Sequence, residues 1–418
     1  MIVHFPNRYE AHRRRTIEQL TFMANQFGLT YEEFEQSNWN SEGLTAVTDI
    51  DNSVPMPPAE APKPAEAPKP APARRGRKPA AAKHSSQAEA LEAALAFIAP
   101  VQNDIIDAGK FVNLNNKMAI IYNGQIAAGH PIIEELTVCP QIGQLIAALK
   151  RCGKTLALTE TEAGQLSIKG DNLRVLVPGI AIEQLSQVMP DAPLISGDFN
   201  KLKEAFKICG LLANENAERV VEASLLLDPN TCTGTNGFAV IQYWHGITDL
   251  PPGIVLPKIF CAAVAACAKN INGIGGTYDT NSCQMSSFTI WFEGGAWLKT
   301  QCYNDKWPDL GKVLDIPNMP TPIAPELFNA VTALEPFLNS YGRVIFKENA
   351  MFTDGSDTTG AQYNVPGLIE GKAFNAKVLK MVAPFVNQID LTTYIDKAYF
   401  VGGEPTNPIR GAIMVFRG

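Results

Sequence analysis

The sequence predicts an α+β protein in which one helix-and-strand architecture is used three times. Helical periodicity returns six times between residues 90 and 418, and strand-like runs with small polar turn residues follow each time. Composition also changes sharply near residue 88, where a Pro- and Ala-rich stretch ends. We therefore divide the 418 residues into a short helical N-terminal segment (1–53), a Pro/Ala-rich disordered linker with a basic run (54–88) and three repeated domains (89–193, 194–317 and 318–418).

The N-terminal extension combines a small helical segment with a tether. Residues 13–27 have an amphipathic pattern, and Thr30 with Glu33 forms a capping box for a second short helix. The linker buries too little apolar area to offset its ordering entropy, so we expect an extended chain there. Its RRGRKP run resembles the core of an AT-hook, which makes Arg75 and Arg77 candidates for contacts in a DNA minor groove. Ordinary solvated charge is the alternative interpretation of this run.

Each of the three repeats contains two expected helices. The opening helices are expected to end near residue 100 and to cover 199–213 and 327–338, and strands follow each of them. The second helices are expected at 141–153, 258–270 and 376–386, where Pro140, Pro257 and Asn375 precede them. More strands follow each second helix, so every repeat is a doubled helix-plus-strands motif.

Composition excludes several classes of protein. Hydrophobic residues make up 46% of the chain and charged residues 18%, which excludes an entirely disordered or fibrous protein. The longest apolar runs, such as 259–268, are shorter than the roughly 18 residues of a spanning helix, and no signal-peptide pattern follows the basic N-terminus. We expect a soluble, cytoplasmic protein without membrane contact. Eight cysteines without a C-x-x-C pair indicate reduced core thiols.

Catalytic and metal-binding motifs find little support. Gly153, Lys154 and Thr155 resemble the end of a phosphate-binding loop, but Ala148 stands where that loop needs its first glycine. His130 and His245 have no cysteine or carboxylate at the spacing of a metal site or a catalytic triad. We expect no catalytic residue, no metal and no cofactor, and hence a protein that is not an enzyme.

Three segments of the repeats carry motifs of a known family. The segment GTNGFAVIQ (234–242) is similar to a turn and strand that open with Thr-Asp-Gly. WLKTQCYNDKWPDL (297–310) is similar to a strand followed by a Phe-Pro-Asp-Tyr turn, and the C-terminal IMVFRG to a Met-Pro-Met-Arg end. Together with the threefold plan, they resemble the bacterial beta sliding clamps, in a divergent form of the phage type, over residues 89–418. Asn236, Trp307 and Val415 depart from the Asp, Phe and Pro of the family.

The resemblance implies three processivity-fold (DNA clamp) domains that close head to tail into a homodimeric ring. Such a protein is a DNA sliding clamp, a replicative processivity factor that encircles duplex DNA and binds DNA polymerase and clamp loader through short linear peptides. If a phage encodes it, it works in the cytoplasm of the bacterial host. Two alternatives are a phage structural or assembly protein that forms an oligomeric ring or shell, and a monomeric processivity factor that does not encircle DNA.

A ring clamp requires basic residues opposite the apolar faces of its helices. The helix at 198–213 has this pattern, because Lys203 and Lys207 lie four residues apart on the side opposite its apolar stripe. The candidate DNA-binding residues of the repeats are Lys150, Arg151, Lys201, Lys203, Lys207, Lys258, Lys269, Lys377 and Lys380. Ordinary solvated helix faces are the alternative interpretation. The opening helices of the first and third repeats lack lysine, and the chain has a net charge of −7, so the lining would be uneven and suited to sliding.

The family resemblance also implies a peptide-binding pocket between the second and third repeats. By position it is built from Thr235, Gly237, Phe238, Val240, Ile395, Met414 and Val415. Such a pocket takes a short linear peptide through apolar anchors. The alternative is that Val240 and Met414 are core residues of adjacent strands.

Overall fold

The computed structural model describes most of the chain beyond residue 81. The described residues are 82–102, 106–153, 155–279, 284–315, 320–322, 326–354, 360–368, 370–404 and 407–416. The expected N-terminal helices, most of the linker, and both AT-hook arginines, Arg75 and Arg77, lie outside them. In the described part, no helix is long and apolar enough to cross a membrane.

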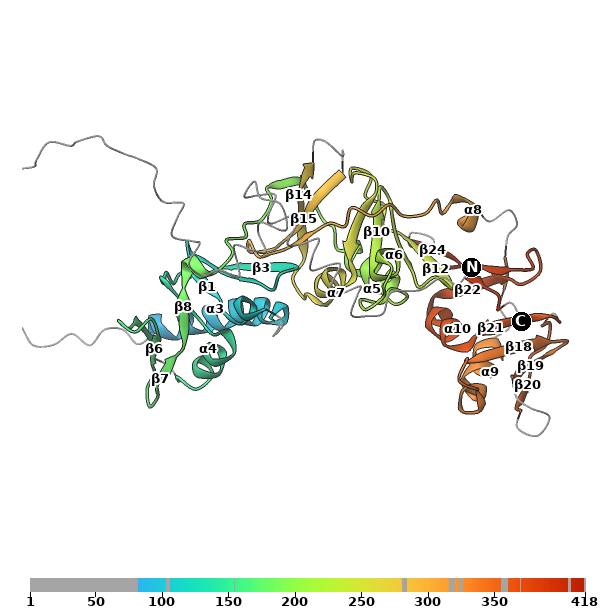
Figure 1. Cartoon of the computed structure of the whole chain (residues 1–418), viewed down its shortest axis with the longest axis horizontal. Coiled ribbons are helices and arrows are strands. Elements are labelled where there is room, and N and C mark those ends of the chain that lie inside the picture. The colour runs from blue at the N-terminus through green and yellow to red at the C-terminus, as the bar shows by residue number, and fades with distance from the viewer. Residues whose placement is uncertain are drawn as a thin grey trace, which may run out of the picture. The chain divides into compact units, whose positions relative to one another are not determined.

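The first repeat opens with a helix that begins earlier than expected (Figure 1). Its elements are α3 (Ala82–Ile98), β1 (Asn113–Asn115), β2 (Met118–Tyr122), β3 (Ile126–Pro131), β4 (Val138–Pro140), α4 (Ile142–Leu149), β5 (Ala157–Glu160), β6 (Leu166–Lys169), β7 (Arg174–Val177) and β8 (Gly179–Ala181). The predicted linker was wrong at its end, because α3 begins at Ala82 and not after residue 88. Ala-rich sequence free of proline follows Pro79, and alanine is the best helix former.

The second repeat repeats this order with two additional short helices. Its elements are β9 (Pro193–Ser196), α5 (Lys201–Cys209), α6 (Val220–Ala223), β10 (Ser224–Asp228), β11 (Thr231–Thr235), β12 (Ala239–Trp244), β13 (Ile254–Pro257), α7 (Lys258–Ala266), β14 (Ile271–Asp279), β15 (Gln284–Phe292), β16 (Trp297–Gln301) and α8 (Gly311–Leu314). The four-residue helices α6 and α8 were not expected, because one helical turn is too short to show periodicity.

The third repeat has the same plan. Its elements are β17 (Thr321–Pro322), α9 (Glu326–Leu334), β18 (Arg343–Lys347), β19 (Ala350–Thr353), β20 (Gln362–Asn364), β21 (Lys372–Asn375), α10 (Ala376–Val382), β22 (Val386–Asp390), β23 (Lys397–Glu404) and β24 (Asn407–Met414). Single 3-10 turns lie at Ala99–Val101, Asp107–Lys110, Ile182–Gln184, Glu335–Phe337 and Ala383–Phe385. The six expected helices are therefore present as α3, α4, α5, α7, α9 and α10.

The sheets join one repeat to the next. One seven-stranded sheet has the order β1-β2-β3-β16-β15-β14-β9, so the third strand of the first repeat pairs antiparallel with the last strand of the second. An eight-stranded sheet has the order β13-β10-β11-β12-β24-β23-β22-β17 and joins the second and third repeats in the same way. At this second seam Gly411 lies opposite Ile241. The two seams follow one rule, and neither can be read from local sequence patterns.

This pairing between repeats leaves two strands, β20 and β7, at the edges of their sheets. The first half of the third repeat forms a four-stranded sheet, β20-β19-β18-β21, in which β20 is an edge. The second half of the first repeat forms the sheet β5-β6-β7, in which β7 is an edge. By position in their repeats, β20 corresponds to β3 and β12, and β7 corresponds to β16 and β24.

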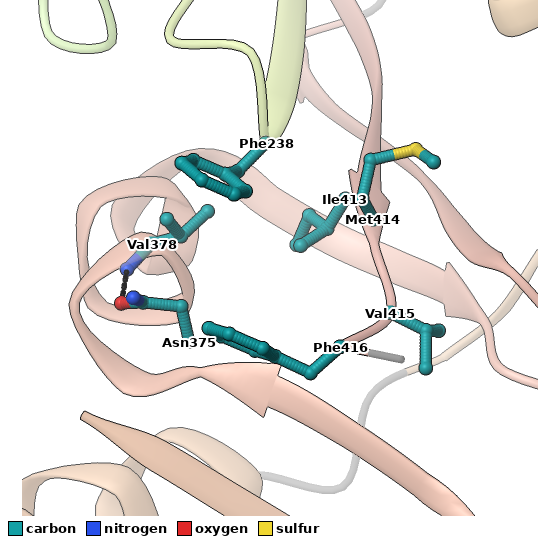
Figure 2. Close-up of a pocket in the computed structure, with 7 residues that line it drawn as sticks. All are labelled: Phe238, Asn375, Val378, Ile413, Met414, Val415 and Phe416. Carbon is teal, nitrogen blue, oxygen red and sulfur yellow. Dashed lines mark hydrogen bonds between the residues drawn. The ribbon is translucent and has the colours of Figure 1, made fainter. Parts of the chain in front are cut away.

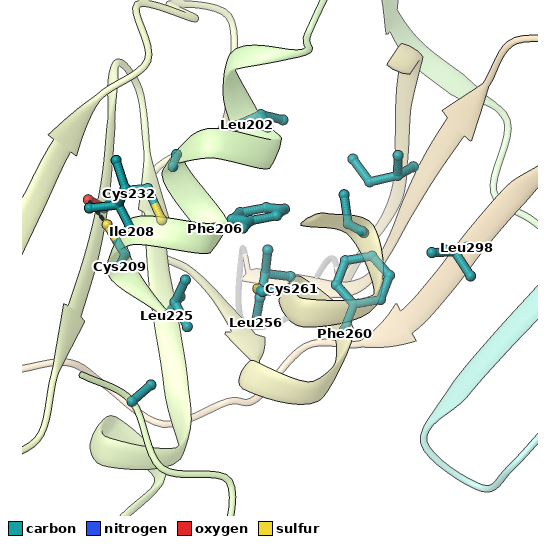
Figure 3. Packing of buried hydrophobic residues seen from close by; sticks show 14 of the residues in the cluster. Leu202, Phe206, Ile208, Cys209, Leu225, Cys232, Leu256, Phe260, Cys261 and Leu298 are labelled. Atoms are coloured by element: carbon teal, nitrogen blue, oxygen red, sulfur yellow. Dashed lines mark hydrogen bonds between the residues drawn. The ribbon is translucent and has the colours of Figure 1, made fainter. Parts of the chain in front are cut away.

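The helices cover one face of the sheets. On the seven-stranded sheet, Ile121, Ala128 and Ile290 belong to the main core together with Leu95 of α3, whereas the neighbouring residue Trp297 lies in a separate small cluster on the other face. In the second repeat, α5 and α7 pack together over their strands through Phe206, Phe260 and nearby apolar side chains (Figure 3). All six long helices contribute buried residues to this main core.

Candidate functional site

A tight turn between β11 and β12 presents an exposed aromatic ring. The Asn236 side chain accepts hydrogen bonds from the backbone N–H groups of Phe238 (3.0 Å) and Ala239 (2.8 Å). Gly237 has φ +80°, a conformation that favours glycine. The hydroxyl of Thr235 donates to the carbonyl of Ala239 at 2.7 Å. This network closes the turn and leaves the Phe238 side chain 58% exposed.

A small pocket lies beside this turn (Figure 2). Its volume is about 120 Å³, and it is lined by Phe238, Asn375, Val378, Ile413, Met414, Val415 and Phe416. The rings of Phe238 and Phe416 face each other across it, with centroids 6.5 Å apart and planes inclined by 18°. The two rings form two of the walls of this small cavity.

The side chain of Asn375 fixes the wall that α10 provides. Its Oδ1 accepts hydrogen bonds from the backbone N–H groups of Lys377 (2.9 Å) and Val378 (3.2 Å), and so caps the helix. The capped first turn places Val378 in the pocket wall (Figure 2). The asparagine expected before this helix therefore has both a capping role and a place in the pocket.

The predicted pocket residues are only partly brought together. Phe238, Met414 and Val415 line the pocket, while Thr235 and Gly237 shape the turn beside it. Val240 is 5% exposed and packs with Leu314, Tyr399 and Ala412 in a separate small core. Ile395 is 92% exposed and is not among the lining residues.

The short helix α8 explains why Val240 is buried and does not line the pocket. Leu314 of α8 is 2% exposed and packs against Val240, so the apolar surface on that strand is already covered from within the chain. Asn375, Val378, Ile413 and Phe416 also line the pocket but were not predicted from the sequence. Phe416 could have been found, because it lies two residues after Met414. Val378 could not have been found in the same way, because its place in the pocket depends on how the second and third repeats meet.

The predicted basic residues are distributed over several helices, and some have partners. Lys201 and Lys207 of α5, Lys377 of α10, and Lys150 and Arg151 after α4 are exposed. Lys258 is half-buried at the start of α7. Lys380 forms an ion pair of 2.5 Å with Glu335. Lys203 and Lys269 are half-buried. The Lys203 ammonium donates to the backbone carbonyl of Lys269, and the Lys269 ammonium contacts the ring of His130.

Asp191, Cys139 and Cys302 are ionisable groups held within the fold. Asp191 is buried and accepts hydrogen bonds from Thr277, Ser287 and Thr289 and from the Lys299 ammonium at 2.8 Å; these donors lower its pKa although burial raises it. Burial raises the pKa of Cys139 to about 12, and Cys302 also to about 12. Over the described ranges, no three His, Cys, Asp or Glu side chains come together as a metal site.

Comparison with known proteins identifies the fold. No family model matches the chain, and no curated protein matches it. Among solved structures it is similar to a DNA polymerase sliding clamp from Pseudomonas aeruginosa solved with a ligand, at 14% identity and a TM-score of 0.66, over 79% of this chain and 98% of that one. It is equally similar to the beta subunit from DNA polymerase of Streptococcus pyogenes, at 13% identity and a TM-score of 0.66, over 79% and 99%.

A third match shows how far the similarity extends. A putative DNA polymerase III beta subunit from Eubacterium rectale matches with a TM-score of 0.62 at only 8% identity, over 79% of this chain and 98% of that one. The fold is therefore a sliding-clamp fold of three repeated α+β domains. More specifically, it is the fold of the bacterial DNA polymerase III beta subunits, as the sequence motifs predicted.

Proposed function

We propose that the protein is a DNA sliding clamp, in which two copies form a ring around duplex DNA and tether a DNA polymerase. The sheet topology carries this proposal. The third strand of each repeat pairs with the last strand of the next, and in the described part of a single chain β20 and β7 lack such a partner. The shared fold with bacterial sliding clamps supports it independently. The protein performs no chemistry itself; it works in the bacterial cytoplasm, and a phage is its source.

The ring closes where the two edge strands meet. Each seam pairs the third strand of one repeat with the last strand of the next, so β20 of one copy would pair with β7 of a second copy. An exposed strand edge offers unpaired N–H and C=O groups that another strand can satisfy. On β7, Leu176 is 51% exposed, so it is open to contact from a strand that pairs with this edge. A head-to-tail dimer uses both edges and leaves neither free.

Substitution at the edge tests the ring. Leu176→Asp places a charge on an exposed position, so the fold should persist while the seam becomes unfavourable. Light scattering after gel filtration should give twice the chain mass for the natural sequence and the single-chain mass for the variant. A natural chain that is monomeric at micromolar concentration would contradict the ring and favour a processivity factor that does not encircle DNA.

Duplex DNA would lie against the helices. The helical side carries the exposed cations Lys201, Lys207 and Lys377, together with Lys150 and Arg151. Few phosphates would be neutralised, which gives weak, salt-sensitive contact compatible with sliding. The acidic net charge of the chain, −7, also opposes tight binding.

The aromatic-walled pocket would receive the partners. A linear peptide from the polymerase or the clamp loader would place one apolar side chain in this pocket, against Phe238 and Phe416. Because Leu314 covers Val240, this pocket offers a single anchor position and not an extended apolar groove. Recognition therefore depends mainly on one side chain and on backbone contacts around it.

A further inference from the structure

A cluster of two lysines and a histidine lies where the first and second repeats meet. Its residues come from both repeats: His130 from β3, Lys203 from α5, and Lys269 from the loop between α7 and β14. The Lys203 ammonium donates to the backbone carbonyl of Lys269, and the Lys269 ammonium lies 3.0 Å from Nε2 of His130. No local sequence pattern links these residues.

Aromatic rings hold the two ammonium groups in place. The Lys269 Nζ lies 5.9 Å from the centroid of Phe97, and the Lys203 Nζ lies 6.0 Å from that of Phe292. The two rings pack edge to face at 5.7 Å. An ammonium over an aromatic face is attracted by the ring quadrupole, so these contacts fix the positions of the charges without neutralising them.

The tautomer of His130 follows from its contacts. An ammonium group can only donate, so Nε2 of His130 accepts the bond from Lys269. The ring proton is therefore on Nδ1, which donates to the carbonyl of Pro131 at 2.8 Å. Burial lowers the pKa of His130, and the Lys269 charge lowers it further against the effect of the Pro131 bond. Neutral His130 thus positions Lys269 and adds no charge of its own.

The two lysines lack carboxylate partners among the described residues. Elsewhere, Lys299 pairs with Asp191 at 2.8 Å and Lys380 with Glu335 at 2.5 Å. Lys203 and Lys269 form no such pair within the described ranges, although both are half-buried. The Lys203 side chain reaches the backbone of Lys269, and each ammonium has spare donor hydrogens, so the pair can bind an anion with several acceptor oxygens.

The cluster lies on the helical side of the seven-stranded sheet. Side chains alternate along β3, so His130 shares the face of Ile126 and Ala128, which belong to the main core under the helices. Phe292 belongs to the same core. In the ring this is the side toward the DNA, and in that respect the inference rests on the proposed function.

We propose that Lys203 and Lys269, positioned by Phe97, Phe292 and His130, form a discrete binding site for one phosphate group of the DNA backbone. The site differs from Lys201, Lys207 and Lys377, which are exposed on their helices. It would make the seam between the first and second repeats a fixed point of contact, while the rest of the lining only screens charge.

Salt dependence of duplex binding by the full chain tests the site. Each phosphate contact contributes about one to the slope of log affinity against log salt. Lys269→Ala and Lys203→Ala should each weaken binding about tenfold, as expected for the loss of a charge-assisted bond, and each should reduce the slope by about one. The double variant should also lose about one, and not two, because both lysines hold the same phosphate.

The matched control is Lys347→Ala. Lys347 is exposed on β18 and lies 4.5 Å from the centroid of Phe352, so it has a similar aromatic setting at a place remote from the cluster. Its removal should leave the slope unchanged. Lys269→Arg should restore the slope, because it retains the charge, and an unchanged melting temperature would separate loss of the site from loss of folding.

A second readout does not depend on ring formation. Inorganic phosphate, added to chain labelled at its five histidines, should shift the ring ¹⁵N resonances of His130, because bound phosphate competes for the Lys269 ammonium. His130 is assigned with His130→Gln. If duplex binding fails but phosphate still shifts His130, the proposed function is wrong and the phosphate site stands. Unchanged His130 resonances, together with an unchanged salt slope in Lys269→Ala, would overturn the site.

Discussion

The ammonium of Lys380 lies 2.5 Å from the carboxylate of Glu335, so a lysine predicted to face DNA has a counter-ion within the chain. The two side chains come from α10 and from the 3-10 turn after α9, and each is about half exposed, at 51% and 52%. A lysine with such a counter-ion can neutralise a phosphate only after its ion pair is broken. On α10, Lys377 is therefore the better candidate for DNA contact.

Removal of this counter-ion should strengthen DNA binding. Glu335→Gln frees Lys380, and the slope of log affinity against log salt should steepen by up to about 0.9. The melting temperature should change little, because exposed ion pairs contribute about 0 to 1 kcal/mol. Titration of a labelled duplex at several salt concentrations measures the effect. Glu348→Gln, at another exposed glutamate, is the control, and equal slopes in both variants would contradict a DNA role for Lys380.

Truncation of either aromatic wall should weaken peptide binding. Burial of a Leu or Phe side chain stabilises by about 1.5 to 3 kcal/mol, so Phe416→Ala or Phe238→Ala should reduce affinity for a polymerase-tail peptide about tenfold or more. Fluorescence polarisation measures it. Phe337→Ala, at a phenylalanine that is 60% exposed elsewhere, should bind as the natural sequence does. Undiminished affinity in both wall variants would place the peptide site elsewhere.

Val240 should behave differently from the pocket walls. It is 5% exposed and packs against Leu314 and Tyr399, so Val240→Ala leaves a cavity in a small core. We expect a loss of about 1 to 3 kcal/mol in the free energy of unfolding and nearly unchanged peptide affinity in the folded variant. Urea unfolding and peptide titration of the same sample check both parts. A stable variant that loses peptide binding would restore Val240 to the site.

Local sequence patterns predicted the helices well and the site only in part. The apolar stripe of α5 and the capping asparagine before α10 depend on neighbouring residues, so they could be read from the sequence. The pocket depends on which strands meet across the seam between β12 and β24, and no local pattern encodes that pairing. The burial of Val240 depends on α8, a helix of four residues that carries no periodic signal.

Acid should destabilise the fold through His245. The side chain is 2% exposed, and burial is the main cause that lowers its pKa to about 4. The unfolded chain binds a proton near pH 6.5 while the folded chain does not, so stability should fall as the pH drops from about 6.5 to 4. The loss should reach about 3 kcal/mol, at 1.36 kcal/mol per pH unit. Urea unfolding across this range should show a shallower pH slope in His245→Gln, and an identical slope would exclude His245 as its source.

The seam between the second and third repeats should not tolerate a side chain at Gly411. A Cβ there would lie 2.2 Å from the ring of Phe400 and 2.3 Å from the backbone carbonyl of Val240. Gly411→Val should therefore cost about 1 to 3 kcal/mol through overpacking, seen as a lower melting temperature. Gly143 in α4 has open space around it, so Gly143→Ala should be neutral or stabilising by up to about 1 kcal/mol. Equal effects of the two substitutions would contradict the tight seam.

Retention on circular DNA tests the central claim most directly. The protein is incubated at high concentration with a nicked circular duplex, isolated with it by gel filtration in salt that removes freely dissociating protein, and followed after the circle is cut. A ring around the duplex should remain on the intact circle and leave the cut one, since the contacts are few and salt-sensitive. Release at the same rate from intact and cut DNA would contradict encirclement.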